Sequence, residues 1–380
     1  MSESAAKPSI TVVVPVYNRE RTVASAVESA LAQNVADIEV ICIDDASSDG
    51  SRRILEGLAA RDPRVRVIEL PVNLGTGAAR KTGILAAKGE YTLCLDADDR
   101  FLPNVFGRLL AKARRRHLDV LHFRSVVVPL GGFSQRAAKR FQRRLDSQLA
   151  TRRAGDWRLL RDQARSESLW FLAVWNKLYR TATLQAAARL FSDNRLVAGE
   201  DSYLMVILLS RLPSWGSTNV HGVEYRFGEG SVSKSMTLEL FNAKLNRADS
   251  CRALLRYAEE ASDREIPGFA GPDKEDVWNA APKACRRRVT WLNYLCSRLE
   301  VFMMEVTWKN IPPEAPSNEL AVYHRKFFDA FGATLCQKFF SQGISSCHVR
   351  ETITFRLGTL LLWPARTTGI LYRTIRRRFR

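Results

Sequence analysis

Three carboxylates follow an apolar run in the stretch between Tyr91 and Asp99. The run 91–95 has the composition of a short buried strand, and Asp96, Asp98 and Asp99 come directly after it. Because Asp is a poor strand residue, we expect the strand to end at Asp96. Carboxylates with no His or Cys beside them suit a hard cation, Mg²⁺ or Mn²⁺, which in turn suits a diphosphate. The stretch alone fits a solvated loop with an Asx turn equally well.

The composition is that of a globular protein with a strong basic surplus. The chain has 380 residues, 46% of them hydrophobic, and 58 Lys and Arg against 40 Asp and Glu give a net charge of +18. That surplus fits nucleic acid, an anionic membrane or phosphate-bearing substrates. No apolar run reaches the ~18 residues of a membrane-spanning helix, and the first residues lack the apolar core of a signal peptide. We therefore expect a cytoplasmic protein, with peripheral binding to the inner face of the cell membrane left open.

Cysteine and histidine give no sign of a zinc site. The seven cysteines include no Cys-x-x-Cys pair, and the five histidines are dispersed without metal-ligand spacing. The odd number of cysteines indicates a reducing compartment.

Strand and helix patterns alternate with short connections over the first part of the chain. Such alternation predicts an α/β fold with a mostly parallel sheet and helices on both faces. The four apolar runs expected to form strands are 10–15, 38–43, 65–70 and 91–95.

The ends of these runs carry polar and aromatic groups. The first ends in Pro15, Tyr17 and Asn18, the second in Asp44-Asp45, and the fourth in the carboxylates after Leu95. Because parallel strands end at one edge of a sheet, these groups are expected to meet there. A ring can stack on a base, a carboxylate can accept a base N–H, and a metal can bridge phosphates. The first strand leads into neither Gly-x-Gly-x-x-Gly nor a P-loop, which argues against a dinucleotide dehydrogenase or a P-loop enzyme.

Five segments, in this order along the first 110 residues, resemble the motifs of family 2 glycosyltransferases of the bacterial polysaccharide-biosynthesis type. They are 14–18, 43–50, 73–83, 87–91 and 95–99. The resemblance implies the GT-A fold and an inverting transferase. It also implies a nucleotide-diphosphate sugar as donor, UDP-linked in most of the family, and a divalent cation, Mg²⁺ or Mn²⁺.

The resemblance also implies roles for residues that match the family's motifs. Those expected to bind the donor are Pro15, Tyr17, Asn18, Asp45, Arg80, Asp96 and Arg226. Pro15 and Tyr17 would line the base pocket, Asp45 would accept from the base, and Arg80 would face the nucleotide or its phosphates. Asp98 would hold the metal with help from Asp96.

An inverting transfer needs a further carboxylate to take the proton of the acceptor hydroxyl. The resemblance places this role at Asp201, with Glu200 orienting or binding the acceptor. The segments 175–180 and 225–233 resemble those that flank such a Glu-Asp pair in the family. Within the second segment, Arg226 would contact the diphosphate. Alternatively, both acids have a purely structural role and stabilise a helix N-terminus through the helix dipole.

Two regions are expected along the chain. Residues 1–235 form the catalytic domain, with a basic insert at about 130–165 that matches no family motif, and 236–380 form a basic, helical region. Basic and aromatic residues in the second region fit docking on an anionic membrane, which would bring the site to a lipid-linked glycan acceptor. They fit a helical cap with a solvated tail equally well.

Two other functions remain in view. A nucleotidyltransferase shares a related sheet but needs a Gly-rich phosphate loop after the first strand, where Pro15 to Asn18 stand instead. A basic nucleic-acid-binding or membrane-binding protein without catalysis leaves the clustered carboxylates unexplained, because Asp repels phosphate unless a cation intervenes. We expect no nucleic-acid partner.

Overall fold

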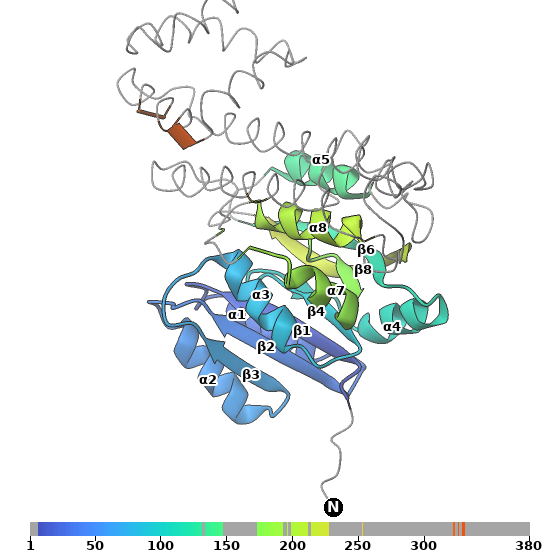
Figure 1. Ribbon diagram of the computed structural model, residues 1–380, viewed down its shortest axis with the longest axis horizontal. Helices are drawn as coiled ribbons and strands as arrows, with labels where there is room; N and C mark the ends of the chain where they lie inside the picture. The colour runs from blue at the N-terminus through green and yellow to red at the C-terminus, as the bar shows by residue number, and fades with distance from the viewer. Residues whose placement is uncertain are drawn as a thin grey trace, which may run out of the picture.

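The computed structural model describes residues 7–130, 134–146, 173–192, 196, 199–211 and 214–227, with the single positions 253, 322, 323, 326, 329 and 330. Its centre is an eight-stranded sheet, formed within these residues, of order β3-β2-β1-β4-β7-β6-β8-β5 (Figure 1). The predicted boundary at 235 and most of the region 236–380 lie outside the described residues.

The first half of the sheet is parallel, as the sequence predicts. Its strands are β1 (Ile10–Val16), β2 (Ile38–Asp44), β3 (Val65–Glu69) and β4 (Tyr91–Cys94). Its crossover helices are α1 (Val23–Leu31), α2 (Ser51–Arg61) and α3 (Thr76–Ala86). Parallel strands need such crossovers, so the carboxyl ends of β1, β2 and β4 meet at one edge.

The second half of the sheet is mixed. The elements are β5 (Arg100–Phe101), α4 (Phe106–Arg115), β6 (Val120–Pro129), α5 (Gln135–Asp146), β7 (Lys177–Arg180), α7 (Thr181–Ala188), α8 (Glu200–Ser210) and β8 (Trp215–Phe227). β7 runs antiparallel between β4 and β6, and β8 is parallel to β6 and antiparallel to β5. Four of the seven strand pairings among the described residues are parallel, so the prediction of a mostly parallel sheet is confirmed. The short segment Lys177–Arg180, which carries two cations, gives no strand signal in the sequence.

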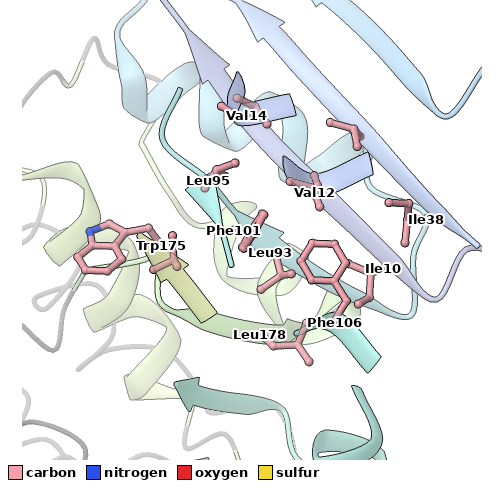
Figure 2. Close-up of a cluster of buried hydrophobic side chains, with 14 of the residues drawn as sticks. Ile10, Val12, Val14, Ile38, Leu93, Leu95, Phe101, Phe106, Trp175 and Leu178 are labelled. Carbon is pink, nitrogen blue, oxygen red and sulfur yellow. The ribbon is translucent and has the colours of Figure 1, made fainter. Parts of the chain in front are cut away.

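Two apolar clusters cover opposite faces of the sheet and confirm that helices lie on both sides. Along β1, Val12 and Val14 belong to one cluster and Val13 to the other, as the period of two requires. Figure 2 shows the first cluster, where side chains of β1 and β4 meet Phe106 of α4. The second packs α3, α7 and α8, and Figure 1 shows α3 and α7 side by side on that face.

Part of the predicted basic insert is the helix α5. Phe141 packs against Tyr225 of β8, while Gln142 donates to the Ser125 carbonyl and accepts from the Val127 N–H, so the helix is fixed on β6. Its exposed basic residues are Arg136, Lys139, Arg140 and Arg143. No helix within the described ranges combines the length and the apolar character needed to cross a membrane.

Candidate functional site

An open pocket of about 440 Å³ lies at the carboxyl ends of β1, β2 and β4, against the first turns of α3 and α8 and the end of β8. It is lined by every residue for which the sequence predicts a role: Pro15, Tyr17, Asn18, Asp45, Arg80, Asp96, Asp98, Glu200, Asp201 and Arg226. The structure thus brings together residues up to about 210 positions apart, at the sheet edge where open α/β folds bind ligands.

Arg80 of α3 joins three carboxylates from two sides of this pocket. One terminal nitrogen of its guanidinium lies 2.6 Å from Asp201 Oδ1 and 3.3 Å from Glu200 Oε1, and the other lies 3.0 Å from Asp96 Oδ1. The side chain is only 3% exposed. Both terminal nitrogens are therefore engaged by carboxylates, which makes Arg80 an organiser of the acidic groups as well as a candidate phosphate contact.

Asp201 is a carboxylic acid whose pKa lies close to neutral pH. It lies in the first turn of α8, which begins after Gly199 in the left-handed region (φ 82°). Burial raises the pKa of Asp201 to about 7; Arg80 opposes this rise, and the charges of Glu200 and Asp96 add to it. A carboxylate with such a pKa can accept a proton near neutral pH, as a general base must. Both acids also sit where the helix dipole favours them.

Asp96 and Asp98 form an acidic corner after β4. Burial, followed by the charge of Asp96, raises the pKa of Asp98, while Arg19 lowers it with its Nε 3.7 Å from Asp98 Oδ2. Within the described residues no group of three or more His, Cys, Asp or Glu could hold a metal by itself. Two neighbouring carboxylates fit a cation that keeps waters and takes its other ligands from a substrate diphosphate.

Asp99 has a structural contact. Its carboxylate is buried and accepts the backbone N–H of Arg226 at 2.8 Å, which ties the end of β8 to the acidic corner. Burial, with the charges of Asp96 and Asp98, raises the pKa of Asp99 well above its usual range. Arg226 also lines the pocket.

The predicted base pocket is held by loop-to-loop hydrogen bonds. Asn18 Oδ1 accepts the Ser48 N–H at 2.8 Å, and the Asn18 N–H donates to Ser47 Oγ, so the loops after β1 and β2 are joined. Asn18 has a φ of 52°, a backbone region that Asn tolerates better than most residues. Tyr17 stands beside it, 45% exposed and free to present its ring to a ligand.

Asp45 fixes the loop that precedes α3. Its two carboxylate oxygens accept the backbone N–H groups of Leu74 at 2.7 Å and Gly75 at 2.8 Å. The side chain is buried at the pocket wall.

Sequence reasoning missed two prominent pocket residues. Arg19 follows the motif 14–18 directly and could have been found by its position, since a cation beside a phosphate site is expected. Tyr225 stacks on Trp175 with ring centroids 4.8 Å apart and planes at 17°. That pair joins β8 to the segment before β7, and only the tertiary fold brings the two rings together.

Several known proteins are similar to this chain in sequence. A model of "Glycosyl transferase family 2" matches residues 11–186. The succinoglycan biosynthesis protein ExoO of Rhizobium meliloti is 31% identical over 270 residues, which are 69% of this chain and 74% of that protein. The uncharacterized glycosyltransferase EpsJ of Bacillus subtilis is 32% identical over 197 residues, which are 51% of this chain and 54% of that relative. The chain therefore spans only about half the length of that relative.

A crystal structure of S. aureus TarS 1-349 in complex with UDP-GlcNAc aligns with 89% of this chain and 93% of that one, at 19% identity and a TM-score of 0.49. A likeness at that level carries no argument about the site.

Proposed function

This chain belongs to glycosyl transferase family 2, and we propose that it moves a hexosyl unit, with inversion, from a nucleotide-diphosphate sugar to a hydroxyl group of a growing cell-surface glycan. The observation that carries the proposal is the single pocket in which a base-side wall, an acidic corner and the carboxylate of Asp201 face one cavity. Each part matches one need of the reaction.

The base-side wall would take the nucleotide, with UDP as the proposed carrier. The exposed ring of Tyr17 can stack on the base beside Pro15, and Asp45 can accept an N–H of uracil. Asn18 would act by joining the loops that carry these two groups.

The acidic corner would take the diphosphate together with a divalent cation. Asp98 and Asp96 are the residues that would hold the ion. When bound, the ion would neutralise the charge that develops on the departing diphosphate. Arg226 and Arg19 line the same cavity and would supply positive charge to the diphosphate.

Asp201 would accept the proton of the attacking hydroxyl group. Because its pKa lies at about 7, the carboxylate is increasingly ionised above neutral pH and can then act as a base. Arg80 binds both Asp201 and Asp96, and so fixes the position of the general base relative to the acidic corner. Glu200 lies beside the base and would orient the acceptor.

We also propose a lipid-linked acceptor and peripheral action at the inner face of the cell membrane. The support is the exposed basic face of α5, since each Lys or Arg near an anionic membrane surface contributes about 1 kcal/mol of attraction. Pelleting with anionic vesicles that falls when these basic residues are replaced by Gln would support this; unchanged pelleting would refute it.

A donor screen tests the enzymatic proposal. Purified protein is given nucleotide sugars with Mg²⁺ or Mn²⁺ and an acceptor extract, and the release of nucleoside diphosphate is measured. We expect release from one donor class, lost in Asp98→Asn and kept in Asp62→Asn, a surface acid paired with Arg64. No release from any donor, or full activity of Asp98→Asn, would contradict the proposal.

A further inference from the structure

Lys177 of β7 is a buried ammonium group beneath the pocket. Its side chain is 0% exposed, donates to the Ala173 carbonyl and, at 2.7 Å, to Asn176 Oδ1, and lies 5.9 Å from the centre of the Trp215 ring. No carboxylate of the described residues lies within ion-pair distance of it. A fully buried Lys without a contacting carboxylate is rare, and burial favours its neutral form over its charged form.

The groups around Lys177 leave one negative charge to interact with it. On β6, His122 lies 3.0 Å from Asn176, and burial, with the charge of Lys177, lowers the pKa of His122 well below its usual value. On β8, Trp215 offers only its ring. Burial lowers the pKa of Lys177 to about 7, and the charge that opposes this fall is that of Asp201.

A short segment also connects Lys177 to Asp201 through the backbone. The ammonium holds the carbonyl of Ala173, and the next residue, Val174, directs its N–H toward Asp201 Oδ2 at 3.5 Å. Tyr179, on the same strand, donates to the Val174 carbonyl at 3.0 Å, so the segment is fixed from two sides. Lys177 can thus act on the Asp201 carboxylate in two ways. One is the electrostatic interaction between the two groups, and the other is the chain of hydrogen bonds through the peptide between Ala173 and Val174.

Electrostatic coupling between two groups acts equally on both. If the charge of Asp201 favours the protonated form of Lys177, the charge of Lys177 favours the ionised form of Asp201 by the same amount. The pKa of Asp201 responds to burial, Arg80 of α3, Glu200 of α8, Asp96 after β4 and the Val174 N–H. The last of these groups follows the Ala173 carbonyl that Lys177 holds.

We propose that Lys177 is a positioning residue for Asp201, which fixes the segment 173–176 against the carboxylate and favours its ionised form with a buried positive charge. The inference rests on the proposed function, in which Asp201 accepts the proton of the acceptor hydroxyl. Lys177 does not line the pocket.

The first test is the pH profile of kcat/KM for Lys177→Met, which removes the charge and keeps the shape. We expect the acid limb to move up by a few tenths of a pH unit, roughly a twofold loss of rate on that limb, with KM for the donor unchanged. Lys177→Arg restores a charge and should move the limb back. Lys112→Met is the matched control, because Lys112 binds Thr218 from α4 and lies outside the pocket. An equal loss at every pH, with the limb unmoved, would overturn the inference.

The second test does not require a Lys177 variant to fold. The titration of Lys177 is followed by NMR in full-length protein with ¹³C-labelled lysine, in the wild type and in Asp201→Asn. We expect the midpoint of Lys177 to fall when the negative charge is removed, and an unchanged midpoint would overturn the inference. If Asp201→Asn retains normal transfer, the proposed base is wrong; if it is inactive while both tests on Lys177 fail, only the role of Lys177 is wrong.

Discussion

Replacing Arg80 with Met removes the cation that holds three carboxylates at the pocket. Removing one partner of a buried ion pair costs about 3–5 kcal/mol of folding free energy, because the remaining charge stays buried and unpaired. The side chains of Asp96, Glu200 and Asp201 are 32%, 12% and 25% exposed, so water partly solvates them. We therefore expect the lower end of that range, about 3 kcal/mol, or a fall of roughly 4 °C in the melting midpoint of the 380-residue chain.

The loss should depend on pH with a definite sign. Arg80 lowers the pKa of Asp201 in the folded protein, so the variant raises that pKa further. An acid whose folded-state pKa lies above its unfolded value stabilises the fold at low pH and loses this contribution as the pH rises. The penalty of Arg80→Met should therefore be smaller near about pH 5 than near about pH 8.

Thermal and urea unfolding of full-length protein at those two pH values provide the measurement. Arg64→Met is the matched control, since Arg64 forms a partly exposed pair with Asp62 and such pairs contribute about 0–1 kcal/mol. A loss for Arg80→Met no larger than that of the control, or the same loss at both pH values, would refute the organising role of Arg80.

Three further predictions concern the apolar core, the pocket for the nucleobase and the general base Asp201. Gly83→Ala places a Cβ 2.4 Å from Val13 Cγ1 and should cost about 1–3 kcal/mol in urea unfolding, whereas Gly57→Ala, with nothing within 4 Å in helix α2, should stabilise by about 0.5–1 kcal/mol. Equal effects of the two changes would contradict the packing of α3 on β1. Asp45→Asn should weaken nucleotide binding about 10–100-fold by calorimetry, since it loses a charged acceptor and loosens the loop before α3; unchanged affinity would exclude Asp45 from the base pocket. In the wild type, the transfer rate should fall as the pH drops through about 7, because Asp201 is then protonated, and a flat rate between about pH 5.5 and 8 would contradict this.

The first half of the fold could be predicted because its signals are local. Apolar, β-branched runs such as that of β1 alternate with helices that have one apolar face, and this pattern gives β1 to β4 and the crossovers α1 to α3. β7 and the first half of β8 could not be found in this way. Lys177–Arg180 is short and carries two cations, and 215–222 contains Gly, Ser, Thr, Asn and His, so only pairing within the sheet makes them strands.

The candidate site could be predicted as a set of residues and not as a set of contacts. Strand ends place Asp96 and Asp98 at one edge of the sheet. The resemblance to family 2 glycosyltransferases adds Asp201, which lines the same pocket. It assigned Arg80 to the phosphates, whereas its observed partners are carboxylates contributed by sequence positions up to 121 residues away. Such a contact depends on how α3 and α8 pack together, which no local pattern encodes.

The central claim is that Asp201 acts as the base in a nucleotide-sugar pocket. The most direct measurement compares Asp201→Asn with the wild type in the rate of sugar transfer and in the affinity for nucleoside diphosphate. If Asp201 is the general base, Asp201→Asn lowers transfer at least about 100-fold, the usual contribution of a positioned base, and retains nucleotide affinity. Normal transfer by Asp201→Asn would contradict this role.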